Sequence, residues 1–304
     1  MKTKFEEIVV VDAIATRVVK ENVEELWKKA EAENIDPITK DAVSTLLLGI
    51  DIQNDFMEGI GALPVSGSKA DLLRLTKWMY NNCSKISKIM CSLDTHTHQQ
   101  IFHPIWWVDK NGNNPSPFTI ITYQDVVDKK WQPVSPYQEE SLTYLKHLAL
   151  SGKKELCIWP YHCIEGTPGV ELEYQFCKML QFHSLARGVE ASLIQKGSNP
   201  LTEMYGIIKA EYDPTAYINL EVLQAVKEYD AIYVAGQASS HCVLESVKQI
   251  VDYYSDQPEV TSKITLLTDC MSPIAGFEEH TIEEFKVLQD SYGVQLRTSV
   301  DVVL

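Results

Sequence analysis

The chain has 304 residues and a net charge of −15, with 45% hydrophobic and 23% charged residues. These proportions are typical of a globular protein large enough for a complete core, and the acidic excess argues against nucleic acid or an anionic membrane as a partner. No apolar run approaches the length of a membrane-spanning helix, and the amino terminus lacks the pattern of a secretory signal peptide.

The seven cysteines are odd in number and include no close C-x-x-C pair. Such a set is not typical of a disulfide framework, so we expect a reducing, cytoplasmic location.

Residues 1–43 precede the main pattern and form a predicted N-terminal extension. Within it, the segment ENVEELWKKAEAENI has the charge and spacing of a helix. Its apolar residues Val23, Leu26 and Trp27 are expected to dock on the body of the protein or on a second subunit.

From Ser44 onward, apolar strand-like runs alternate with segments whose apolar residues have helical spacing. Strands are predicted at 44–51, 85–94, 153–160, 189–197, 230–236 and 263–269. Helices are predicted at 69–83, 170–188, 219–229, 242–254 and 278–293. This alternation predicts one α/β domain over residues 44–304, with an open, mostly parallel sheet and helices on both faces in a Rossmann-like three-layer arrangement.

Residues 104–153 interrupt the alternation with a segment rich in Pro, Asn, Trp and Tyr. A connection this long in a compact domain is usually functional or disordered, and its three tryptophans argue against disorder. We expect an insertion that closes over the site as a lid or makes an oligomer contact, with a helix near 139–150.

Polar side chains follow five of the predicted strands at the point where each strand ends. They are Asp51, Asp94 with His96 beyond it, His162, Lys196 and Cys242. Because open parallel sheets carry their chemistry at the carboxyl ends of the strands, we expect these side chains to share one crevice.

Cys242 opens a predicted helix directly after the small-residue turn QASSH. The helix dipole at that position favours a thiolate, which is the nucleophilic form of cysteine. The alternative interpretation is a buried, inert cysteine.

Asp51 and Lys196 could supply the groups that a cysteine nucleophile needs. Burial at the end of an apolar strand would raise the pKa of Asp51 toward that of a useful base, and Lys196 could stabilise developing negative charge. The backbone N–H groups of Ala238 and Cys242 could form an oxyanion hole. A salt bridge beside an idle thiol remains the alternative.

Asp94 and His96 are two residues apart, so in an extended segment both side chains point to the same side and could bind one ion. We expect His162 to be a third ligand and His103 a possible fourth, whereas His98 is expected to be solvated. Carboxylate and imidazole ligands suit Zn²⁺, Fe²⁺ or Mn²⁺, and Zn²⁺ is the first expectation.

Three aromatic residues lie close in sequence to these polar groups. Phe56, Trp159 and Tyr205 could wall a flat pocket for a ring-shaped substrate. Composition alone favours the simpler interpretation that they are core residues.

Five segments in this order resemble motifs of the cysteine hydrolases of the isochorismatase-like superfamily, and those of nicotinamidases and pyrazinamidases most closely. The segments are GIDIQNDF, SLDTHTHQQIFHP, WPYHCIEGTPG, QKGSNPLTEMYG and VAGQASSHCVLES. The resemblance places Asp51 as the catalytic acid and base, Lys196 as the catalytic lysine and Cys242 as the nucleophile. It also implies a metal segment at Asp94, His96 and His103, and a non-proline cis peptide at Gln237–Ala238.

The resemblance implies an amidohydrolase that cleaves a small planar amide to an acid and ammonia through a cysteine thioester. A divalent metal would assist, and we expect a homo-oligomer that binds a small molecule, without nucleic acid or membrane. Hydrolysis of a ureido or carbamoyl compound, and a non-catalytic binding protein of the same fold, are the alternatives.

The chain departs from the family pattern at its pocket rim. Ser240 stands where nicotinamidases often have Asp, and Thr95 stands where an aromatic residue is common. The extension and the long insertion are further departures. They leave the predicted chemistry intact and leave the substrate open.

Overall fold

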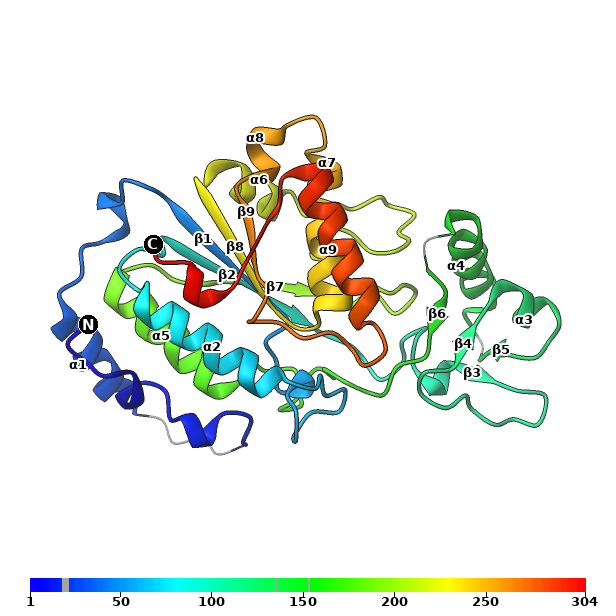
Figure 1. Ribbon diagram of the computed structural model, residues 1–304. Coiled ribbons are helices and arrows are strands. Elements are labelled where there is room, and N and C mark those ends of the chain that lie inside the picture. The colour runs from blue at the N-terminus through cyan, green and yellow to red at the C-terminus, as the bar shows by residue number, and fades with distance from the viewer. Residues whose placement is uncertain (18–21, 135, 153) are drawn as a thin grey trace.

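A computed structural model describes residues 1–17, 22–134, 136–152 and 154–304. Its centre is a six-stranded parallel sheet in the order β10-β9-β8-β1-β2-β7 (Figure 1). These strands are β1 (Thr45–Ile50), β2 (Lys88–Asp94), β7 (Ser192–Lys196), β8 (Ala231–Gly236), β9 (Ile264–Leu267) and β10 (Gln295–Arg297). The predicted open α/β sheet is confirmed, with β10 as an edge strand that the sequence pattern did not predict.

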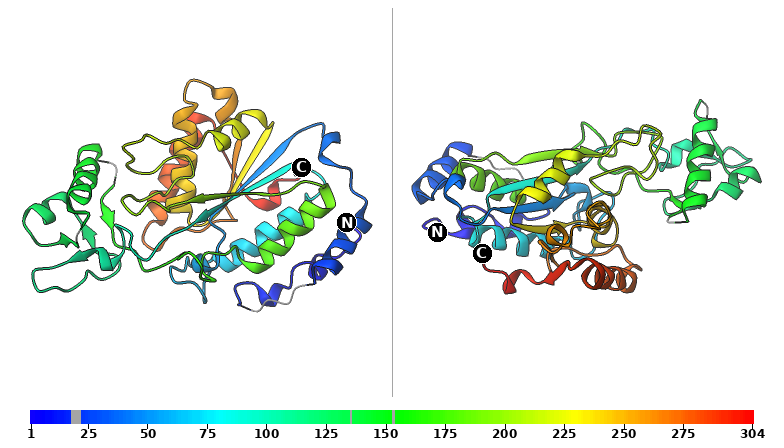
Figure 2. Two further views of the ribbon diagram at one scale, coloured as in Figure 1. Left: turned by 180° about the vertical axis from the view of Figure 1, so that it is seen from behind. Right: turned by 90° about the horizontal axis from the view of Figure 1, so that it is seen from above.

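Alternation along β1 divides the core into two layers, because successive side chains of a strand point to opposite faces. Leu46 and Leu48 enter a cluster formed with the helices on one face, and Leu47 enters the cluster on the other face. The first face carries α6 (Leu220–Glu228), α7 (Leu244–Tyr253) and α9 (Glu278–Tyr292), and the second carries α1 (Val23–Glu33), α2 (Ser68–Asn81) and α5 (Tyr174–Arg187). Figure 2 shows these layers from behind and from above.

The N-terminal segment packs along α5, on the side of the molecule away from residues 104–153 (Figure 1). Leu26 is buried in the second cluster, as expected for docking on the body. Trp27 and Val23 are exposed instead, because they lie on the outer face of α1. Glu33 fixes the chain start by accepting hydrogen bonds from the backbone N–H groups of Lys2 (2.7 Å) and Thr3 (2.6 Å).

Residues 104–153 form a lobe beside the sheet, built from short elements (Figure 1). They are β3 (Trp107–Val108), β4 (Ile120–Ile121), α3 (Tyr123–Val127), β5 (Gln132–Pro133) and α4 (Gln138–Ser151), of which α4 matches the predicted helix. Buried aromatic residues of the lobe, Trp106, Trp107 and Tyr144, share a cluster with Phe56 and Trp159. The lobe therefore packs on the same apolar residues that flank the predicted site.

The predicted strand at 153–160 is wrong as a strand of the central sheet. Only β6 (Leu156–Cys157) forms there, and it pairs antiparallel with β4 of the lobe. The apolar residues of the run pack into the aromatic cluster of the lobe, with Ile158 and Trp159 both buried. Lys153 lies outside the described residues.

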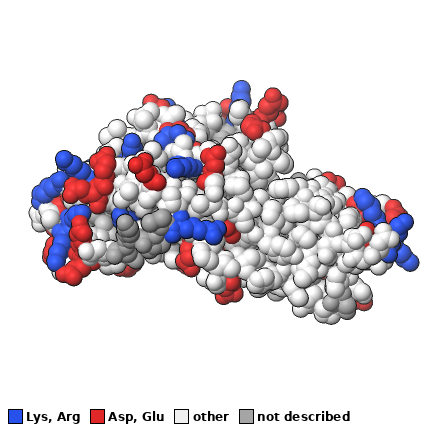
Figure 3. All heavy atoms as spheres, turned by 90° about the horizontal axis from the view of Figure 1, so that it is seen from below, with Lys and Arg blue, Asp and Glu red and all other residues white. Residues whose placement is uncertain are grey.

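Short turns complete the chain. The remaining α-helix is α8 (Pro258–Thr261), and the short 3-10 or π turns are Phe5–Glu7, Val11–Ala13, Ile38–Lys40, Asn54–Phe56, Pro104–Trp106, Ser239–Val243 and Ser299–Asp301. Among the described residues, every helix is too short or too polar to cross a membrane. On the face drawn in Figure 3, basic and acidic side chains are intermixed.

Candidate active site

Four of the five predicted strand ends lie side by side at the carboxyl edge of the sheet. Asp51 follows β1, Asp94 ends β2 and Lys196 ends β7, while Cys242 lies in the turn after β8. These strands are adjacent in the sheet, so their ends meet. The side chains of all four residues are buried at one point of the molecule.

Lys196 is the centre of this group, which we call the strand-end cluster (Asp51, Asp94, Lys196 and Cys242). Its Nζ lies 2.9 Å from Asp51 Oδ2, 3.0 Å from Asp94 Oδ1 and 3.7 Å from Cys242 Sγ. Burial alone would lower the pKa of Lys196, but Asp51 and Asp94 together raise it well above its usual value. The ammonium is therefore a fixed positive charge between two carboxyl groups and a thiol.

Asp51 is fully buried beneath the cysteine. Its Oδ1 accepts a hydrogen bond of 2.6 Å from the Ser92 hydroxyl, and the Asp51 backbone N–H donates to the same Ser92 Oγ. Burial raises the pKa of Asp51, and the negative charge of Asp94 adds to this, although Lys196 and Ser92 oppose it. A carboxyl group with a raised pKa is suited to take up and return a proton.

Cys242 is a thiol in the resting protein, which corrects the expectation of a thiolate. Burial raises the pKa of Cys242 well above its usual value, because Lys196 only partly offsets the loss of hydration. A hydrogen bond with Asp51 raises it further. The turn Ser239–Val243 is also a π-type turn rather than the first turn of a regular α-helix. Ionisation of Cys242 therefore requires a proton acceptor, and Asp51, which shares a hydrogen bond with the thiol, can be that acceptor.

The turn before Cys242 has the backbone arrangement that the resemblance implied. The Gln237–Ala238 peptide is cis, as expected. The N–H groups of His241 and Val243 donate to the Ala238 carbonyl, and the Gln237 N–H donates to Ile50. Within the described chain, the Ala238 N–H has no hydrogen-bond partner, so it is available to a ligand. Gly236 precedes the turn at φ 129°, where a side chain would collide with the Ile50 backbone.

Asp94, His96 and His162 form a group that could hold a divalent metal ion, since one ligand atom from each lies within 4.8 Å of the others. His96 Nδ1 lies 3.0 Å from the Gly197 carbonyl and His162 Nδ1 lies 2.7 Å from the Pro160 carbonyl. A carbonyl can only accept, so each Nδ1 carries the hydrogen and each Nε2 of a neutral ring presents a lone pair.

Both Nε2 atoms face the Asp94 carboxylate, at 2.9 Å for His96 and 3.6 Å for His162. Burial alone would raise the pKa of Asp94, but the nearby His96 and Lys196 lower it well below its usual value. Three electron-pair donors thus converge in a buried place, and a cation among them would satisfy all three. The residues fit the divalent metal ion that the sequence motifs imply.

His103 is not one of the three residues whose ligand atoms lie within 4.8 Å of one another, so its role as a fourth ligand stays a prediction. Its ring centroid is 6.1 Å from that of His96 and 6.3 Å from that of His162. Its Nδ1 is 3.2 Å from the His98 carbonyl, which holds the ring at the end of its own loop. The His103 ring also packs against Tyr161 in a tilted arrangement, with ring centroids 4.7 Å apart.

His162 reaches the group from a loop, because the strand predicted before it does not join the sheet. Asp55 fixes the loop: its Oδ2 accepts from the Cys163 N–H at 2.7 Å, and its Oδ1 accepts from the Ala62 N–H at 3.2 Å. The His96 N–H donates to the Cys163 carbonyl at 2.9 Å, which joins the two imidazole-bearing segments.

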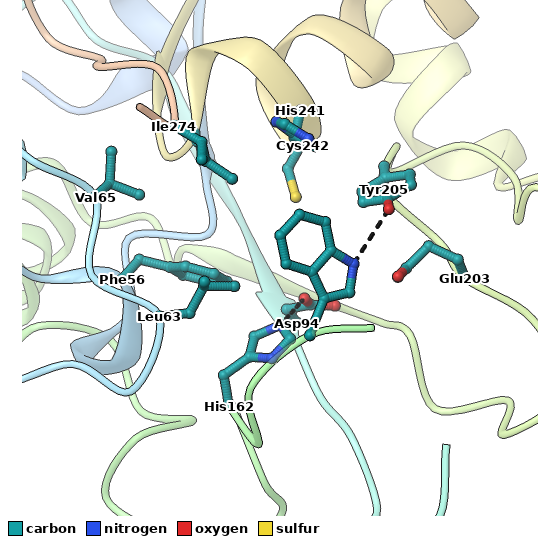
Figure 4. A pocket seen from close by; sticks show the side chains of 12 residues that line it. Phe56, Leu63, Val65, Asp94, His162, Glu203, Tyr205, His241, Cys242 and Ile274 are labelled. Atoms are coloured by element: carbon teal, nitrogen blue, oxygen red, sulfur yellow. Dashed lines mark hydrogen bonds and ion pairs between the residues drawn. The ribbon is translucent and has the colours of Figure 1, made fainter. Parts of the chain in front are cut away.

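A pocket opens over the cysteine and the metal-binding group (Figure 4). It encloses about 390 Å³ of empty space, part of it open to solvent. The three predicted aromatic residues, Phe56, Trp159 and Tyr205, do line it. The Trp159 indole N–H donates to the Tyr205 hydroxyl at 3.2 Å, and the Lys154 ammonium lies 4.3 Å from the centre of the Tyr205 ring.

Two polar residues that line the pocket were not predicted from the sequence. His241 lies beside the nucleophile, and Glu203 lies in the segment after Lys196. Burial raises the pKa of Glu203 to about 7, an effect that Asp94 strengthens and His96 opposes. The segment 198–206 has no regular secondary structure, so no hydrophobic periodicity indicated where its side chains point.

Known proteins resemble this chain in sequence and in fold. No protein-family profile matches the chain. A nicotinamidase of Saccharomyces cerevisiae is 22% identical over 233 residues, which cover 72% of this chain and 92% of that protein. The solved structure of an Acinetobacter baumanii nicotinamidase/pyrazinamidase has a TM-score of 0.58 at 18% identity and covers 87% of this chain and 100% of that one.

The yeast nicotinamidase bound to the inhibitor nicotinaldehyde also has a TM-score of 0.58 at 18% identity, covering 84% of this chain and 99% of that one. The structural similarity establishes the fold. The resemblance to nicotinamidases that the sequence motifs indicated is confirmed.

Proposed function

We propose that this protein is a cysteine-dependent amidohydrolase that converts a small planar amide, similar to nicotinamide, to the corresponding acid and ammonia. The observation that carries this proposal is the position of Cys242 Sγ, 3.7 Å from a lysine that is also paired with Asp51. The nucleophile thus lines an aromatic pocket, and a proton acceptor with a raised pKa and a fixed cation are buried next to it.

In the first half-reaction, Asp51 takes the thiol proton of Cys242 and the sulfur attacks the amide carbonyl carbon. The Ala238 and Cys242 N–H groups stabilise the resulting oxyanion. Asp51 then gives its proton to the amide nitrogen, the C–N bond breaks and ammonia leaves, which produces a thioester. Lys196 stabilises the negative charge that shifts between Cys242 and Asp51 during these steps.

In the second half-reaction, water attacks the thioester carbonyl while Asp51 accepts a proton from it. The C–S bond breaks, the acid is released and the sulfur regains its proton. Asp94, His96 and His162 would hold a divalent ion, with Zn²⁺ expected and Fe²⁺ or Mn²⁺ as alternatives, and this ion would supply Lewis-acid polarisation of a ring nitrogen or a water molecule when bound.

We further propose that residues 1–43 are an extension to a hydrolase domain at 44–304, and that residues 104–153 form a lid beside the pocket entrance. The contact between Phe118 of this lobe and Trp159 of the pocket, with ring centroids 5.9 Å apart, supports that role. All seven cysteines are free thiols, which supports a cytoplasmic location. A homo-oligomer remains our prediction.

The test is an ammonia-release screen of the zinc-loaded protein with nicotinamide, pyrazinamide and an N-carbamoyl amino acid. Cys242→Ala should abolish release, whereas Cys83→Ala, at a buried cysteine in the core away from the pocket, should retain it. Release at the wild-type rate from Cys242→Ala would contradict the proposal. Turnover of the carbamoyl compound alone would replace nicotinamide-like amides by ureides as the substrate class.

A further inference from the structure

His241 is a pocket residue that the proposed reaction does not use. It lies between Ser240 and the nucleophile, and its ring is held by three aromatic neighbours. The ring centroids lie 4.8 Å from Phe277, 5.6 Å from Trp159 and 5.7 Å from Tyr205. Its orientation is therefore fixed by packing.

The hydrogen bonds around Ser240 determine which nitrogen of His241 carries the hydrogen. The Ile274 N–H donates to Ser240 Oγ at 3.0 Å, and Ser240 Oγ lies 2.8 Å from His241 Nδ1. A backbone N–H can only donate, so the hydrogen of the Ser240 hydroxyl itself still needs an acceptor. Among the described residues, His241 Nδ1 is the acceptor within reach. Nδ1 therefore accepts, and the ring hydrogen resides on Nε2.

The charge state of the ring is consistent with this assignment. Burial lowers the pKa of His241 to about 4, and Lys154 and His280 lower it further, while Glu245 opposes them. At neutral pH the ring is uncharged and has a single N–H. No hydrogen-bond partner contacts Nε2 within the described part of the chain.

We propose that His241 is a specificity-determining residue, held by Ser240 so that its Nε2–H donates to an acceptor atom on the ring of the substrate. This inference rests on the proposed amidohydrolase function. In Figure 4, His241 and Cys242 lie on one side of the pocket, and Asp94 and His162 lie on the other. A planar ring bound between them has polar contacts at both edges. The favoured class is an aromatic carboxamide with two acceptor atoms in or on the ring.

Kinetics with matched substrates test this role. Pyrazinamide has two ring nitrogens and nicotinamide has one, and we expect wild-type kcat/KM to favour pyrazinamide. His241→Phe keeps an aromatic ring between Phe277 and Trp159 but removes the donor, so this preference should fall about five- to tenfold, the worth of one hydrogen bond. Ser240→Ala should cause a smaller change in the same direction, and the control variant Cys83→Ala, in the core away from the pocket, should leave the preference unchanged. An unchanged preference in His241→Phe would overturn the proposal.

Nitrogen-15 NMR of the labelled imidazole tests the tautomer without any turnover. The wild-type ring should show a protonated Nε2 and a bare Nδ1, and Ser240→Ala should shift the ring toward a mixture of the two tautomers. A protonated Nδ1 in the wild type would contradict the assignment even in an active enzyme. If instead neither amide releases ammonia from the wild type, the amidohydrolase proposal fails, and the NMR result still decides the state of His241.

Discussion

The strand-end cluster and the pocket wall meet at the cavity that Cys242 and Asp94 line, but the chain builds them in different ways. Asp51, Asp94 and Lys196 are placed by the register of three adjacent parallel strands. The wall residues Phe56, Trp159 and Tyr205 come from loops that pack on the lobe of residues 104–153. This difference indicates that the sheet fixes the chemistry, whereas the loops and the lobe select what reaches it.

The largest expected effect comes from removing the charge at the centre of the cluster. Lys196→Met leaves Asp51 and Asp94 buried without their cation, so the free energy of unfolding should fall by roughly 3–5 kcal/mol. Urea unfolding of the metal-free protein measures this. Lys248→Met, which breaks a more exposed pair with Glu284, should cost less than about 1 kcal/mol. Equal losses in the two variants would mean that the cluster has no special role.

The second-largest effect is expected from replacing Asp51, the proposed proton acceptor. Asp51→Asn preserves the shape of the side chain but cannot take the thiol proton, so kcat/KM for amide hydrolysis should fall about 10²- to 10⁴-fold. Ser92→Ala removes only the 2.6 Å hydrogen bond to Asp51 and should cost roughly tenfold. Steady-state ammonia release measures both, and an Asp51→Asn enzyme as active as Ser92→Ala would show that another group accepts the proton.

Glu203 lines the pocket, and its pKa depends on Asp94 of the strand-end cluster, so its ionisation couples the pocket wall to the cluster. Its pKa is about 7 in the folded protein against an ordinary value of 4.5. Ionised Glu203 is therefore penalised only in the folded state, and this penalty develops as the pH rises from about 4.5 to 7. Glu203→Gln should stabilise the chelator-treated protein at pH 8 by up to about 3 kcal/mol relative to its effect at pH 4.5. A stability difference that does not vary with pH would disprove the raised pKa.

The smallest effect on stability and activity is expected from a substitution in the pocket wall, at Tyr205. Tyr205→Phe removes the hydroxyl that accepts from the Trp159 indole at 3.2 Å but keeps the ring beneath Lys154. The loss should be about 1 kcal/mol in unfolding free energy, with a few-fold rise in KM for the amide and little change in kcat. A fall in kcat comparable to that of Asp51→Asn would place Tyr205 among the catalytic groups.

The sequence was sufficient for the parts that depend on regular periodicity. Apolar runs ending in Asp51, Asp94 and Lys196 predicted both the parallel sheet and the convergence of these residues, because strand ends in such a sheet share one edge. Cys242 and the cis peptide before it were also placed as the motifs implied.

The sequence failed where tertiary contacts override local pattern. The run before His162 has strand-like composition, yet it packs on the lobe rather than in the sheet. The thiolate expected at Cys242 is a thiol, because complete burial outweighs the nearby lysine. Glu203 lay in a segment without periodicity and gave no signal.

The central claim is that Cys242, deprotonated by Asp51, forms a covalent thioester during amide hydrolysis. Acid quenching of the metal-loaded enzyme during turnover of its amide substrate, followed by peptide mass spectrometry, tests this most directly. We predict the mass of the acyl group on the peptide that contains Cys242, and no such adduct in Asp51→Asn. Turnover at the full rate with an unmodified Cys242, or in the Cys242→Ala variant, would contradict the account.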